Sequence, residues 1–155
     1  TEAGVNEPKA TFSTCFGEPF MVRDPSVYAE LLGQRIRRHD TDCWLVNTGM
    51  TGGPYGEGHR IALDHTRAMV DAILDDTLSD VSRTRDSVFG LSVPTQVPGA
   101  PTALLTPRKT WDDPEAFDRH ARDLVDAFAD NFETYVEQVE PEVRAAGPSP
   151  EAVHG

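Results

Sequence analysis

Three stretches of the chain carry apolar residues at helical spacing. Asp24-Pro25 and Asp113-Pro114 each pair a capping side chain with a proline suited to the first helical position, so each predicts a helix start. Asp64 is expected to cap the remaining helix. The apolar positions recur three or four residues apart and should face a core: Val27, Tyr28, Leu31, Leu32 and Ile36; Met69, Val70, Ile73 and Leu74; and Phe117, Ala121, Leu124, Val125, Phe128, Phe132 and Tyr135.

Shorter apolar or extended stretches outside these helices indicate strands. Residues 43–46 (Cys-Trp-Leu-Val) are apolar throughout, as in a buried strand. Residues 12–16 predict a short strand, and residues 79–107, foremost the stretch 87–93, predict strands or extended segments among several prolines. After Glu140 the chain is rich in Pro, Ala, Gly and Glu, so we expect residues 141–155 to fray. Helices mixed with short strands predict an α/β chain of the mixed α+β kind, with three main helices.

Composition narrows the classes of function. The chain has 155 residues, which suits one compact domain. Asp and Glu number 26 against 14 Lys and Arg, and the net charge of −12 argues against nucleic-acid binding, which needs a cationic face. No apolar stretch in the sequence is long enough to span a bilayer. The two cysteines cannot form a disulfide framework and form no C-x-x-C pair, which favours a reducing compartment.

Much of the negative charge lies in residues 111–142, which hold eleven acidic and two basic side chains. Such a run is typical of a solvated helix face. A cation site is the alternative, but the run lacks the fixed ligand spacing of a calcium loop. The five histidines likewise show no spacing that predicts a metal site.

A glycine-rich stretch is the strongest candidate for ligand binding. Residues 47–58 contain five glycines, which let the backbone turn sharply and approach a ligand closely. They lack the Gly-Lys-Ser/Thr of a phosphate loop. Three residues that follow could hold a planar base. The Arg60 guanidinium can stack on the base, the Ile61 side chain can cover it, and the Thr66 hydroxyl, at a helix start, can form a hydrogen bond with it. An ordinary connection from a loop to a helix is the alternative.

A set of motifs in chain order makes this candidate more specific. They are TEAGVNEP at 1–8, ATFSTCFG at 10–17, WLVNTG at 44–49, TGGPYG at 51–56, RI at 60–61, HTRA at 65–68, VPTQVPG at 93–99, PRKTW at 107–111 and DNFETY at 130–135. On these motifs the chain resembles the C-terminal part of an ATP-dependent phosphoenolpyruvate carboxykinase.

The resemblance implies a fold and a role. Residues 1–140 would form part of the family's mononucleotide-binding domain, with residues 1–17 in a lid that closes over the active site, and Arg60, Ile61 and Thr66 would lie around adenine and ribose. Family members convert oxaloacetate and ATP to phosphoenolpyruvate, ADP and carbon dioxide in gluconeogenesis, using Mg²⁺ and Mn²⁺. The implied partners are therefore ATP, ADP and oxaloacetate, without nucleic acid or membrane, in the cytoplasm.

Two kinds of departure bear on these implications. Met50, His59 and Ala3 stand where the family usually has Trp, Lys and Arg, and the last two differences remove positive charge near a polyanionic ligand. In the family, the phosphate loop, the metal-binding residues and the oxaloacetate-binding arginine all precede the matching part. We therefore expect no catalytic residue and no metal ligand in these residues, and no activity from the chain alone. A free-standing adenine-nucleotide-binding or regulatory module is the alternative, and a degenerate structural domain is the next.

Overall fold

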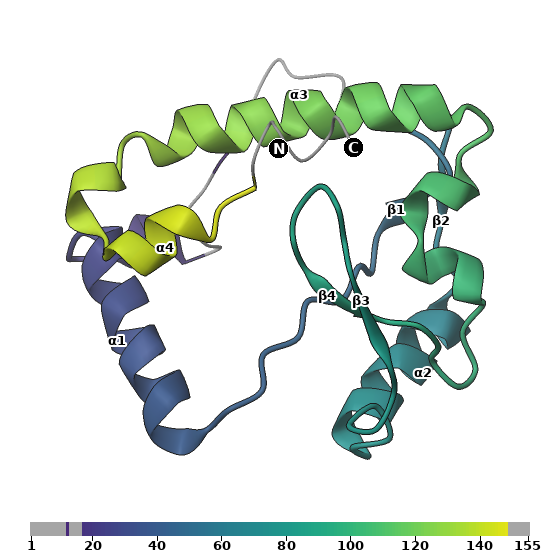
Figure 1. The fold of residues 1–155 in the computed structure, drawn as a ribbon, viewed down its shortest axis with the longest axis horizontal. Helices are drawn as coiled ribbons and strands as arrows, with labels where there is room; N and C mark the ends of the chain where they lie inside the picture. Colours follow the sequence, from purple (N-terminus) through teal and green to yellow (C-terminus); the bar gives the residue numbers. More distant parts are fainter. Residues whose placement is uncertain (1–11, 13–16, 149–155) are drawn as a thin grey trace. The chain divides into compact units, whose positions relative to one another are not determined.

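The computed structural model describes Phe12 and residues 17–148 (Figure 1). Within them the chain forms two compact units, residues 17–44 with 130–145 and residues 45–129 with 146–148. Helices are combined with two antiparallel two-stranded sheets, so the predicted mixed α+β class and its three main helices are confirmed. No helix in these residues is long and apolar enough to cross a membrane. Apart from Phe12 and Gly17, the predicted strand at 12–16 and lid at 1–17 lie outside the described residues.

Helix α1, Pro25–His39, begins where the sequence predicts. The Asp24 carboxylate accepts hydrogen bonds from the Ser26 hydroxyl at 2.7 Å and from the Ser26 amide at 2.9 Å. Both bonds, that of the hydroxyl foremost, favour the ionised carboxylate and lower the pKa of Asp24. At the other end Asp40 turns the chain in a left-handed conformation, with φ of 48°.

Apolar residues around α1 are less covered than the sequence predicts. Leu31 and Leu32 are 50% and 61% exposed, and no residue of α1 is buried within the described part of the chain. The buried strand predicted at residues 43–46 is wrong, because Cys43 is exposed and Leu45 is 83% exposed. An extended apolar segment forms a buried strand only where it pairs with another strand, and none of the described strands pairs with residues 43–46.

The residues that follow α3 in the first unit are more regular than their composition suggests. The 3-10 turn η4, Val136–Gln138, precedes a short helix, α4, Pro141–Ala145, and the Arg144 guanidinium donates to the Val136 carbonyl. Residues 141–145 are therefore helical rather than frayed, because the proline opens a helical turn that this bond ties back to η4. Residues 149–155 of the predicted tail lie outside the described residues. A further 3-10 turn, η1, spans Glu18–Phe20.

Helix α2, Leu63–Leu74, opens the helical part of the second unit. Its N-cap is Ala62, which offers no capping side chain, and Asp64 lies inside the first turn. The predicted Asp64 cap is therefore wrong. The helix starts two residues earlier because the amides of His65 and Thr66 already bond the Ala62 carbonyl, at 3.0 and 3.2 Å.

The buried face of α2 is also rotated from the predicted one. Val70 and Leu74 are 38% and 77% exposed, whereas Ala72 is buried. The less exposed positions share one face: His65, Thr66, Ala68, Met69, Ala72 and Ile73. A Cβ built on Gly99 would lie 2.9 Å from the Ala68 Cβ, so small residues on both sides let this turn approach the helix closely.

The strands predicted within residues 79–107 are present, but the stretch 87–93 is mostly a hairpin turn. Strand β3, Arg83–Arg85, pairs antiparallel with β4, Ser92–Pro94, and residues 86–91 connect them. The Asp86 carboxylate accepts the amides of Val88 at 3.0 Å and Phe89 at 2.6 Å, and Gly90 has a positive φ of 68°. An aspartate that bonds amides two and three residues on, followed by a left-handed glycine, ends a strand rather than continuing it.

Helix α3, labelled in Figure 1, spans Pro114–Phe132 and supplies core residues of the second unit. Val125 is fully buried and Ala121 is 5% exposed, and both pack against Val88, with Phe89 and Phe117 at the edge of the cluster. The predicted apolar stripe is confirmed at these positions, while Leu124 and Phe128 are 43% and 42% exposed. Two 3-10 turns precede the helix: η2, Thr102–Leu105, and η3, Pro107–Thr110.

The acidic side chains of residues 111–142 lie on the surface. All of them are exposed except Asp118, which is half-buried, so the predicted solvated face is confirmed. Asp113 caps α3 as predicted, accepting the Glu115 amide at 2.9 Å. Hydrogen bonds from backbone amides, that of Ala116 foremost, and from Arg119 lower the pKa of Asp113.

Candidate functional site

The glycine-rich stretch folds as a hairpin between two very short strands. Strand β1, Met50–Thr51, pairs antiparallel with β2, His59–Arg60, so that Met50 lies opposite Arg60 and Thr51 opposite His59. The Ile61 amide continues the ladder by donating to the Gly49 carbonyl at 3.0 Å. The sequence predicted that the glycines let the backbone turn sharply here, and the structure adds the strand pair that closes the turn.

Glycine is favoured at two positions of this hairpin, at one because backbone atoms lie close and at the other because φ is positive. A Cβ at Gly58 would lie 2.5 Å from the Gly53 carbonyl oxygen and 2.9 Å from that of Thr51. A Cβ at Gly52, where φ is 82°, would lie 2.8 Å from the His59 ring. A side chain at Gly58 would therefore collide with the backbone, and one at Gly52 would be strained by the left-handed conformation.

The three predicted ligand-binding residues lie on one continuous segment, from β2 into α2. Arg60 is exposed on β2, and none of the described carboxylates forms an ion pair with it. Ile61 is only 8% exposed, so the protein already covers most of its side chain. Thr66 is half-buried in the first turn of α2. The segment thus offers an exposed guanidinium, an apolar support and a hydroxyl at a helix start.

Residues further along the chain hold this segment and the strand beside it, and no local pattern in the sequence marks these contacts. The Thr51 and Thr110 hydroxyls are 2.8 Å apart, which ties β1 to η3. Nδ1 of His65 lies 3.2 Å from the Gly99 carbonyl oxygen, which ties the start of α2 to the turn at residues 97–100. The only signal for these pairs was that each partner belongs to one of the motifs quoted above.

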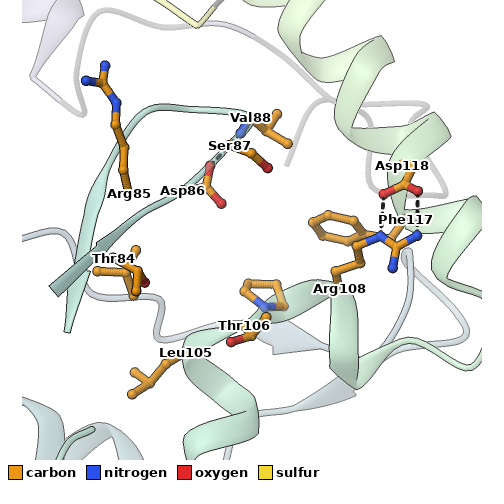
Figure 2. A pocket seen from close by; sticks show the side chains of 12 residues that line it. Thr84, Arg85, Asp86, Ser87, Val88, Leu105, Thr106, Arg108, Phe117 and Asp118 are labelled. Carbon is orange, nitrogen blue, oxygen red and sulfur yellow. Dashed lines mark hydrogen bonds and ion pairs between the residues drawn. The ribbon is translucent and has the colours of Figure 1, made fainter. Parts of the chain in front are cut away.

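A cavity of ≈480 Å³ lies elsewhere in the second unit, between the β3–β4 hairpin, η3 and the start of α3 (Figure 2). Arg108 donates two hydrogen bonds of 2.8 Å to the carboxylate of Asp118. This pairing raises the pKa of Arg108 and lowers that of Asp118. In Figure 2 the Arg85 guanidinium points away from this pair. Arg60, Ile61 and Thr66 do not line the cavity, so it is separate from the predicted nucleotide segment.

The acidic and histidine side chains do not assemble a metal site in the described part of the chain. Across Phe12 and residues 17–148, no three of the His, Cys, Asp and Glu side chains come together in a way that could hold an ion. The Mg²⁺ and Mn²⁺ implied by the resemblance therefore do not fit any group of residues that the structure describes.

Comparison with known proteins decides the family. A family model described as phosphoenolpyruvate carboxykinase matches residues 1–103. The whole chain is 83% identical over 155 residues to phosphoenolpyruvate carboxykinase (ATP) 1 of Salinibacter ruber. The chain belongs to the phosphoenolpyruvate carboxykinase family. Within that family, 98% of the chain is 55% identical to phosphoenolpyruvate carboxykinase (ATP) 2 of Salinibacter ruber, and 94% is 54% identical to the Pelobacter propionicus enzyme.

The chain corresponds to only a part of these carboxykinases. It spans 29% of the length of each Salinibacter ruber relative and 28% of that of the Pelobacter propionicus relative. The match to the first relative nevertheless covers 100% of the chain, so the β1–β2 hairpin and α2 both lie inside it.

Proposed function

We propose that this chain forms the C-terminal part of an ATP-dependent phosphoenolpyruvate carboxykinase, which converts oxaloacetate and ATP to phosphoenolpyruvate, ADP and carbon dioxide in gluconeogenesis. The observation that carries the proposal is the 83% identity over the whole chain to a relative named phosphoenolpyruvate carboxykinase (ATP) 1. A free-standing binding module is not favoured, because every relative named above is a carboxykinase of which the chain spans less than a third. The enzyme is proposed to act in the cytoplasm.

The part of the reaction that we assign to this chain is binding of the adenosine end of ATP. Arg60 is exposed beside a backbone held by the β1–β2 ladder, so its guanidinium is free to stack on the adenine ring. Ile61 supports this edge from the buried side. Thr66 places a hydroxyl in the first turn of α2, where it can bond the ribose or the base.

Positioning is the contribution that these residues make to catalysis. Holding adenosine fixes the position of the phosphates relative to the rest of the enzyme, which makes phosphoryl transfer effectively intramolecular. Because no group of described residues fits a metal ion, no step through Mg²⁺ or Mn²⁺ is assigned to this chain. A role of residues 1–17 in a closing lid stays a prediction, as they lie almost entirely outside the described residues.

A titration with ATP and with ADP, followed by ligand-observed NMR, tests this assignment. Arg60→Ala should cost roughly 0.5–2 kcal/mol of binding free energy, the range for cation–π contacts. Thr66→Val should cost about 0.5–1.5 kcal/mol, as expected for one neutral hydrogen bond. Both losses should be alike for the two nucleotides, because the proposed contacts are to adenosine. Arg38→Ala, an exposed arginine on α1, is the matched control and should bind as the parent does.

Two results would contradict the assignment. One is a folded parent chain, confirmed by its far-UV spectrum, that shows no saturable nucleotide binding at millimolar concentration. The other is an Arg60→Ala variant that binds as tightly as Arg38→Ala, which would remove Arg60 from the site while leaving the family unchanged.

A further inference from the structure

Thr51 is a buried polar residue next to the proposed nucleotide edge. The residue is 8% exposed, and no other polar or charged residue in the described part of the chain is as deeply buried. A buried hydroxyl needs a hydrogen-bond partner, and within these residues Thr51 has one, the Thr110 hydroxyl at 2.8 Å. The partner lies 59 positions along the chain, at the end of η3.

The hydrogen bonds around Thr110 fix the direction of each donor. The Thr110 hydroxyl donates its proton to the Pro107 carbonyl at 2.7 Å. It therefore acts as an acceptor for its other two contacts, the Thr51 hydroxyl at 2.8 Å and the Gly52 amide at 3.2 Å. One hydroxyl thus uses its single donor and two acceptor positions to join η3 to the end of β1.

The hairpin needs such an anchor because its own ladder is so short. Two strands of two residues each are marginal without further packing. The anchored corner, Thr51 and Gly52, also touches β2, because Thr51 pairs with His59 and a Cβ on Gly52 would lie 2.8 Å from the His59 ring. The same Cβ would lie 3.3 Å from the Thr110 carbonyl oxygen. The corner is therefore held between η3 on one side and β2 on the other.

We propose that Thr110 is a positioning residue for the nucleotide edge. It fixes β1, and β1 in turn fixes Arg60, which pairs with Met50, and Ile61, whose amide bonds Gly49. Thr110 is proposed to act through β1 and not by contacting the nucleotide itself. The proposal rests on the proposed function, since it presupposes that Arg60 and Ile61 bind adenosine.

The test compares Thr110→Val with Thr110→Ser and with Thr102→Val, all made in the full chain. Thr110→Val removes the hydroxyl and leaves the Thr51 hydroxyl and the Gly52 amide without their acceptor. Thr110→Ser keeps the hydroxyl, and Thr102→Val makes the same chemical change at an exposed position of η2. ATP is the probe, titrated by ligand-observed NMR, and amide hydrogen exchange at Ile61 reports the hairpin without nucleotide.

Thr110→Val should bind ATP roughly threefold to tenfold more weakly, because the fraction of chains with a formed hairpin falls. Its Ile61 amide should exchange faster by a similar factor, while Thr110→Ser and Thr102→Val match the parent in both measurements. If Thr110→Val loses its far-UV helical signal, the Thr51→Val/Thr110→Val double variant replaces it. This variant leaves no hydroxyl of the pair buried without a partner, and it should still show both losses.

The outcomes separate this proposal from the proposed function. If the parent binds ATP and a folded Thr110→Val variant matches it in affinity and in Ile61 exchange, the role of Thr110 is refuted and the nucleotide edge stands. A folded parent that does not bind ATP refutes the nucleotide edge and with it the positioning role. Unchanged affinity in the double variant, or failure of Thr110→Ser to restore binding, would equally overturn the role of Thr110.

Discussion

Val125 is the residue on which the core of the second unit depends most, because its side chain is fully buried among Val88, Ala121 and their aromatic neighbours. Val125→Ala removes two methylene equivalents, worth about 1.6 kcal/mol of transfer free energy at about 0.8 kcal/mol each. A cavity that does not collapse adds roughly 1 kcal/mol, and the higher helix propensity of alanine returns about 0.5 kcal/mol. We expect the free energy of unfolding to fall by about 2 kcal/mol.

Leu74→Ala is the informative control because it removes more of the side chain yet should cost less. Leu74 is 77% exposed at the end of α2, so three deleted methylene equivalents should lower the stability by only about 0.5 kcal/mol. Urea unfolding followed by far-UV circular dichroism measures both variants against the parent. Equal losses for the two variants, or a loss below about 0.5 kcal/mol for Val125→Ala, would refute the assignment of the core.

Two further predictions concern pH and activity. The pKa values of Asp24 and Asp113 lie below the ordinary 3.8. The ionised caps of α1 and α3 therefore stabilise the folded chain above that pH, and this stabilisation is lost as the pH falls through the lowered pKa values. An acid titration followed by circular dichroism should show the helical signal of Asp24→Asn falling less than that of the parent below pH 4, and identical curves would contradict this. The chain alone should form no phosphoenolpyruvate from oxaloacetate and ATP with Mg²⁺ and Mn²⁺, and product above a no-protein control would contradict that expectation.

Features that depend on neighbouring residues could be predicted from the sequence. Asp24-Pro25 and Asp113-Pro114 marked two helix starts because the cap, the proline and the bonded amides all lie within three residues. The stripe of α3 was visible because packing repeats every turn, and its centre, Ala121 and Val125, is buried as expected.

Features that depend on distant residues could not be predicted. Residues 43–46 have the composition of a buried strand, but a strand requires a partner, and composition cannot supply one. The face of α2 follows from the close approach of Gly99 to Ala68, which no periodicity in residues 63–74 reveals. In the candidate site, Arg60, Ile61 and Thr66 could be proposed because they lie in motifs within one short segment. The Thr51–Thr110 pair could not, because its residues are 59 positions apart and leave no local pattern.

A segment exchange tests the central claim most directly. The part of Salinibacter ruber phosphoenolpyruvate carboxykinase (ATP) 1 that matches this chain is replaced by residues 1–155, and phosphoenolpyruvate formation from oxaloacetate and ATP is measured. We predict an active enzyme in which Arg60→Ala raises the KM for ATP by roughly 2- to 30-fold, the factor that corresponds to a cation–π contact, and leaves the KM for oxaloacetate unchanged. A folded exchange enzyme that forms no phosphoenolpyruvate, or an Arg60→Ala variant with an unchanged KM for ATP, would contradict the account.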